Sequence, residues 1–229
     1  MERQDRNRAE TSMEGALEVL SGFAAAEDLT LRIGDLERML SAKTTEEAKK
    51  LLNVERIDSS VLEAALAVKR VAGQINVIVH AIGILVSLPY VLDPEERIES
   101  LSLGAGNTGR MHDLETDRQI AEFKFIEWRG GPESIRQNSL FIDFFNLVSA
   151  RTRKRRVLYV VGKAAPLRFL NNRRAIASVL SKNAAVAERF RSLYGKRFTT
   201  VREFYATVED EVDIVDLAEI VPALQTNKG

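Results

Sequence analysis

The run Arg-Val-Leu-Tyr-Val-Val-Gly at 156–162 constrains the fold more than any other segment of the chain. Its apolar residues are continuous instead of alternating with polar ones, which is typical of a strand covered on both faces. Strands of this kind belong to sheets that carry helices on each side. The sequence therefore predicts an α/β domain in which a sheet lies between two layers of helix.

Apolar spacing and turn residues place the other elements around this strand. In chain order, the expected segments are a helix at 61–86 ending before Pro89, strands at 98–103, 111–116 and 119–128, a helix at 133–150, the strand at 156–162, and helices at 166–182, 184–194 and 200–224. The order helix, three strands, helix, strand predicts a mixed four-stranded sheet flanked by helices, with additional helices at both ends of the chain.

Residues 1–58 form a helical region that we expect to be separate from a domain at 59–229. The segment 29–40 carries apolar residues at helical spacing, and Thr44 or Thr45 followed by two glutamates resembles the beginning of a helix. This region could be a dimerisation arm, a helical cap or a small DNA-reading element, and its sequence does not choose among them.

One apolar stretch raises the question of a membrane. Residues 75–92 contain 18 residues without a formally charged side chain, the lower limit for a spanning helix. Because Asn76, His80 and Ser87 interrupt this stretch, we expect a helix buried inside a soluble domain and no membrane. The chain has no cysteine, and its first residues form no apolar signal segment, so a cytoplasmic location is expected.

The charge of the chain is unevenly distributed. It holds 33 basic and 33 acidic side chains in total, but residues 151–205 hold 15 Lys and Arg against 2 Asp and Glu. A basic block of this kind attracts phosphates, although it could also be a solvated surface balanced by the acidic tail. The residues expected to contact nucleic acid are Arg151, Arg153, Lys154, Arg155 and Arg156.

Two predicted strands, 111–116 and 119–128, bring acidic residues together. If the hairpin turns between Asp117 and Arg118, Asp113 lies opposite Glu122, and Lys124 points to the same side. Directly opposed like charges are destabilising. A divalent cation with oxygen ligands, such as Mg²⁺, is the simplest reason for the pair.

The alternative is an exposed hairpin whose charged side chains are solvated. However, Glu122 and Lys124 lie in Ala-Glu-Phe-Lys-Phe-Ile at 121–126, where apolar residues flank both charges. Charges within an otherwise buried strand are costly, which favours a functional site.

The segments His-Asp-Leu-Glu-Thr-Asp at 112–117 and Ile-Ala-Glu-Phe-Lys-Phe at 120–125 resemble the PD-(D/E)xK, restriction-endonuclease-like nuclease superfamily. The resemblance covers residues 60–162, where the predicted order of elements matches the αβββαβ core of that fold. The sequence departs from the pattern at His112, where the motif has proline, a position that varies widely in the superfamily.

The resemblance implies a site and a cofactor. Asp113 and Glu122 would bind Mg²⁺, with Mn²⁺ as a substitute, and the backbone carbonyl of Phe123 would complete the metal shell. Lys124 would assist the attacking water, so that Asp113, Glu122 and Lys124 are the expected catalytic residues. Residues that could contribute further are Glu63 on the first core helix, His112 as a proton shuttle and Gln137 at the start of the following helix.

The expected function is therefore a metal-dependent phosphodiesterase acting on nucleic acid, with DNA favoured over RNA. The alternative is a nuclease fold without activity that serves as a nucleic-acid-binding or protein-interaction module, as in a defence or toxin system. Since cleavage of both strands of a duplex often takes two sites, a homodimer is expected by analogy.

Overall fold

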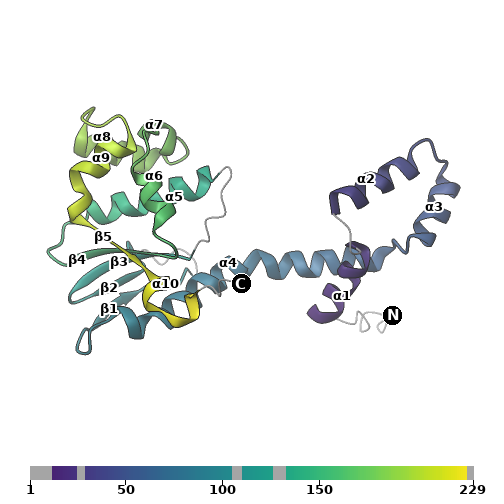
Figure 1. Cartoon of the computed structure of the whole chain (residues 1–229), viewed down its shortest axis with the longest axis horizontal. Helices are drawn as coiled ribbons and strands as arrows, with labels where there is room; N and C mark the ends of the chain where they lie inside the picture. The colour runs from purple at the N-terminus through teal and green to yellow at the C-terminus, as the bar shows by residue number, and fades with distance from the viewer. Residues whose placement is uncertain (1–11, 25–28, 105–109, 126–132, 226–229) are drawn as a thin grey trace, which may run out of the picture. The chain divides into compact units, whose positions relative to one another are not determined.

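The computed structural model describes residues 12–24, 29–104, 110–125 and 133–225 (Figure 1). The chain divides into two compact units, residues 1–76 and 77–229. The boundary between the units falls within one long helix, α4 (Ser59–Val91). The end of the predicted strand at 119–128 lies partly outside the described residues.

The first unit is helical, as predicted, with α1 (Met13–Ala24), α2 (Leu29–Leu40) and α3 (Thr45–Val54) preceding α4. Thr44 caps α3 because its side chain accepts a hydrogen bond from the backbone of Glu47, whose carboxylate binds the Thr44 backbone in return. Among the described residues of this unit, only the small side chains of Ala16 and Ala64 are buried. The unit therefore has almost no apolar core of its own.

The helix α4 is longer than the sequence predicts, since it continues through Pro89 to Val91. The prediction that it ends near Val86 is wrong. Proline lacks only its own N–H donor, and Pro89 lies in the last turn, where the backbone of Leu92 still donates to Leu88 at 3.1 Å.

The prediction that the apolar stretch of α4 is buried is also wrong. Every residue from 71 to 79 is exposed, and only 11% of the most apolar 18-residue window is buried. The sheet covers one side of the last turns, where Ile84 and Ser87 are fully buried. By length and composition alone, α4 is apolar enough to cross a membrane.

The second unit contains a five-stranded mixed sheet with helices on both faces (Figure 1). Its strands, in spatial order, are β1 (Ile98–Leu101), β2 (Leu114–Thr116), β3 (Gln119–Lys124), β4 (Arg155–Val160) and β5 (Asp213–Asp216). The first three strands pair antiparallel and the last three parallel. With α5 (Ser134–Val148) between β3 and β4, the order α4-β1-β2-β3-α5-β4 is the one the sequence predicts.

The fifth strand and the helices around it correct the prediction for the C-terminal region. A helix at 200–224 is wrong, because β5 lies within it and its short segment Asp-Ile-Val-Asp has too few apolar residues for their spacing to distinguish strand from helix. A single helix at 166–182 is also wrong, whereas the helix at 184–194 is confirmed. The observed elements are α6 (Ala164–Leu170), α7 (Ile176–Val179), α8 (Ala184–Tyr194), α9 (Val201–Val208), η1 (Glu209–Glu211), α10 (Leu217–Ile220) and η2 (Pro222–Leu224).

Two apolar clusters hold the sheet between its helical layers (Figure 1). On one face, α5 to α9 enclose a cluster rich in aromatic rings around Phe145 and Phe204. On the other face, Phe123 stacks on Tyr159 beneath the end of α4 and α10. The strand β4 is covered on both sides, as its continuous apolar sequence predicts.

Candidate active site

The β2–β3 hairpin has the predicted register. Leu114 pairs with Ala121 and Glu115 with Ile120, so the turn is centred between Asp117 and Arg118. Extending this register by one residue aligns Asp113, directly before β2, with Glu122. The Asp113 Oδ2 atom accepts a hydrogen bond from the backbone N–H of Phe123 at 2.9 Å, which ties the two segments together.

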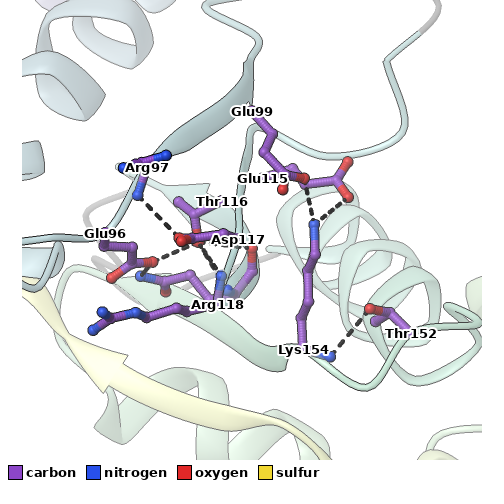
Figure 2. Close-up of polar contacts among 10 residues, drawn as sticks. Glu96, Arg97, Glu99, Glu115, Thr116, Asp117, Arg118, Thr152 and Lys154 are labelled. Atoms are coloured by element: carbon purple, nitrogen blue, oxygen red, sulfur yellow. Dashed lines mark hydrogen bonds and ion pairs between the residues drawn. The ribbon is translucent and has the colours of Figure 1, made fainter.

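A polar network fixes the hairpin turn and thereby its register (Figure 2). The Thr116 hydroxyl accepts hydrogen bonds from the backbone N–H groups of Arg118 and Gln119 at 3.0 and 2.8 Å and donates to Glu96. The Asp117 carboxylate accepts the backbone N–H of Arg97 at 2.9 Å. Because a shift of one residue would break all these bonds, the turn holds Asp113 on the side of Glu122.

Glu122 is a buried acid of the site with a raised pKa. It is only 7% exposed. Burial, followed by the nearby charges of Asp143 and Asp113, raises the pKa of Glu122 to about 10. His112 lies beside it, with Nδ1 at 3.1 Å from Oε1 of Glu122. In the absence of a cation, this position therefore favours a protonated carboxyl group.

Lys124 is held by α5. Its ammonium forms an ion pair with Asp143 and donates to the Ser139 hydroxyl at 3.1 Å. Burial alone would lower the pKa of Lys124. The negative charge of Asp143 and its hydrogen bond to Lys124 outweigh burial, and the charge of Glu122 acts in the same direction, so the pKa of Lys124 is raised. Burial raises the pKa of Asp143 in spite of its lysine partner. Lys124 therefore remains charged at neutral pH.

Asp143, Ser139 and His80 are site residues that sequence reasoning missed. A signal existed for the first two, because Asp143 is the one acid in the apolar helix α5 and Ser139 lies four residues before it, on the same face. His80 lies with Nε2 at 3.3 Å from Oδ1 of Asp113. Both histidines of the chain, His80 and His112, thus contact the two carboxylates of the hairpin.

The additional residues proposed from the sequence have different positions. His112 is next to Glu122, and burial lowers the pKa of His112 against the pull of Glu115 and Asp113. Gln137 accepts a hydrogen bond from Arg174 at 2.8 Å and has no polar contact with the acids among the described residues. Glu63 is exposed and belongs to the first unit. The position of α4 that reaches Asp113 is His80.

The basic run at 151–156 lies toward the opposite end of the strands from Lys124. In the parallel pair, Arg155 aligns with Gln119, whereas Lys124 aligns with Val160. Lys154 binds Glu99 and Glu115 at 2.6 and 2.9 Å, as Figure 2 shows.

The rest of this run is also partly neutralised. Arg155 pairs with Asp213 at 2.5 Å, and Arg156 lies 3.8 Å from Glu211. Within the part of the chain that the structure describes, Arg151 and Arg153 are the cations of this run without an ion-pair partner. These two side chains are therefore the ones free to bind phosphate.

A search of the described residues for three or more His, Asp or Glu side chains arranged to hold a metal ion finds none. A cation bound at this hairpin would therefore draw on two carboxylates together with backbone oxygen and water, a common set for Mg²⁺. The chain matches no protein-family model, and neither a curated protein nor a solved structure shows significant similarity to it.

Proposed function

We propose that this protein is a metal-dependent nuclease that hydrolyses phosphodiester bonds, with DNA as its substrate in preference to RNA. The observation that carries the proposal is the alignment of Asp113 with Glu122 across the hairpin, with Lys124 two residues further along β3. The order of α4, the first three strands, α5 and β4 supports a restriction-endonuclease-like core, to which β5 adds an edge strand.

The charges of the site fit a divalent cation. Three carboxylates, those of Asp113, Glu122 and Asp143, act on one another in a buried region, and the ammonium among them in the described part of the chain is that of Lys124. Burial, followed by the charges of Asp143 and Asp113, raises the pKa of Glu122 to about 10, and a bound Mg²⁺ would offset the negative charge of these neighbouring acids. Asp113, Glu122 and the backbone carbonyl of Phe123 would hold the ion. When bound, the metal would polarise the phosphate and make its water more acidic.

The protein's own groups have separate tasks in this proposal. Lys124 keeps its proton and is positioned by Asp143 and Ser139, so it can orient the attacking water or offset negative charge that develops on the phosphate. His80 and His112 orient the carboxylates of Asp113 and Glu122.

Nucleic acid is the substrate class that fits the charge distribution. Residues 151–205 carry 15 basic and 2 acidic side chains, and the side chains of Arg151 and Arg153 are exposed in this block. Cations at a distance from the site would bind the phosphate backbone without reading the sequence.

The test is a cleavage assay with purified protein on single-stranded, double-stranded and branched DNA and on RNA, with Mg²⁺, Mn²⁺ or a chelator. We expect cleavage of DNA that requires the metal and is lost in Asp113→Ala and Lys124→Ala, while binding persists in both variants. Binding without cleavage by the wild-type protein would support the inactive binding module instead. A protein that neither binds nor cleaves any of these substrates would rule out the proposal.

A further inference from the structure

An apolar stripe runs along α4 at the spacing of a helix–helix contact. Its residues, Ile75, Ile78, Ile82 and Leu85, are separated by three, four and three positions, which is the repeat that keeps one face of a helix in register with another helix. Val68 and Val71 continue the same spacing toward the beginning of the helix.

In the second unit, the α4 stripe is exposed on the side of the helix opposite Ile84, and Ile78 and Ile82 border a pocket that Phe125 and Val161 also line. Ile78, Ile82 and Leu85 are 47%, 52% and 42% exposed, whereas Ile84 and Ser87 are fully buried against the strands. The sheet therefore already occupies one side of the helix. The stripe is a second apolar side that remains without cover among the described residues, and contiguous exposed apolar surface marks an interaction site.

The first unit independently needs a partner. Four helical segments meet there, yet the described residues bury only Ala16 and Ala64, and the large side chains of Leu31 and Ile33 are 65% and 44% exposed. Helices whose apolar faces lack a core are stable only when another body covers them.

A lipid bilayer does not fit this surface. The uncharged part of α4 runs from Val71 to Val91, but from His80 onward the helix is engaged with Asp113 and the sheet. Gly83 lies so close to the Phe125 ring that an added Cβ would be 2.7 Å from it. The free residues 71–79 span about 14 Å, roughly half of the 30 Å of a hydrocarbon core.

We propose that a second copy of this chain covers the α4 stripe, so that the two α4 helices pack against each other across a twofold axis. The α4 segment between Arg70 and Asp93 contains no Asp, Glu, Lys or Arg, and its stripe has the spacing of a helix pair, so the same helix of a second copy meets it without repulsion between these side chains. The inference does not depend on nuclease activity.

Sedimentation equilibrium of the full-length protein tests the proposal. We expect the wild-type protein to have twice its chain mass of 25.6 kDa at micromolar concentration. Ile82→Glu should raise the dimer dissociation constant about 100-fold or more, because it would bury an unpaired charge. The matched control is Lys69→Glu, which adds the same side chain to the same helix at an exposed position off the stripe.

Because the chain contains no cysteine, a second measurement is independent of destabilising variants. Four variants would each carry one cysteine, at Ile75, Ile78, Ile82 or Leu85. At least one of them should form an intermolecular disulfide on mild oxidation, whereas the Lys69→Cys variant should form none. A wild-type protein that is monomeric at about 100 µM, or a stripe where no cysteine cross-links, would overturn the proposal. Flotation with phosphatidylcholine–phosphatidylglycerol vesicles would overturn it in favour of a membrane.

Discussion

Lys124 on β3 and Asp143 on α5 form a buried ion pair that joins the sheet to the helix packed on it. The pair holds the ammonium beside Glu122 and keeps it charged. The lysine of the motif is therefore fixed by a residue that lies outside the motif itself.

Asp143→Asn should lower kcat about 10- to 100-fold and change KM little, because Lys124 loses its positioning partner. Asp143 raises the pKa of Lys124, so Asp143→Asn should lower that pKa. In a plot of activity against pH, the variant should therefore lose activity on the alkaline side at a lower pH than the wild-type protein. Ser139→Ala, which removes only one hydrogen bond to Lys124, should have a smaller effect. An unchanged pH profile in Asp143→Asn would argue against this positioning role.

Glu122→Gln should stabilise the metal-free protein at pH 8. The pKa of Glu122 is raised to about 10, so its contribution to stability is full below the ordinary value of 4.5 and is lost as the pH rises toward 10. A neutral amide avoids that loss, and we expect a gain on the order of 1–3 kcal/mol in chelator. Thermal unfolding with and without Mg²⁺ measures it. The wild-type protein, and not the variant, should be stabilised by the metal.

Glu96→Gln should weaken the hairpin turn. Burial opposes ionisation of Glu96, but hydrogen bonds from Thr116, the Asp93 backbone and Gln119 outweigh it and lower its pKa. Its stabilising contribution is therefore present above pH 4.5 and disappears as the pH falls through the lowered pKa.

We expect a loss of about 1 kcal/mol at pH 7 in Glu96→Gln, because the group is partly solvated. The difference from the wild-type protein should shrink as the pH falls below 4.5 and through the lowered pKa of Glu96, as measured by urea denaturation. Glu95→Gln, at the exposed neighbouring position, is the control. Equal losses in both variants at pH 7 would contradict a specific role for Glu96.

Replacing both Arg151 and Arg153 with alanine should lower the affinity of the protein for nucleic acid, by a similar factor whatever the nucleotide sequence. If both guanidinium groups bind phosphates, the slope of log K against log salt should decrease by about 2 in the double alanine variant. Arg155→Ala should leave the slope unchanged, because Arg155 pairs with Asp213. Fluorescence anisotropy at several salt concentrations distinguishes the two outcomes.

The hairpin could be predicted from the sequence because its information is local. The Thr116 hydroxyl accepts the backbone N–H groups of Arg118 and Gln119 in the turn, so the register follows from a few adjacent residues. The capping boxes at Thr44 and Thr200 were predictable for the same reason. The two-sided burial of β4 followed from its unbroken apolar sequence.

The remaining features depend on contacts between distant segments. His80 and Asp143 lie 33 and 30 residues from Asp113 in the sequence. The apolar helix α5 marks Asp143 as unusual, but nothing beside His80 indicates that it contacts the hairpin. The strand β5 owes its existence to pairing with β4 at the edge of the sheet. The exposure of α4 depends on what lies beside the helix, which an apolar composition does not specify.

Both histidines of the chain lie at one location, because His80 pairs with Asp113 and His112 pairs with Glu122. Their imidazole groups therefore report on this site alone. In a nitrogen-15 NMR spectrum of the histidine side chains, every signal would come from an imidazole beside one of the two acids of the hairpin. Titration with Mg²⁺, with substrate or with acid could therefore be followed at this site in the isotopically enriched protein, without any substitution.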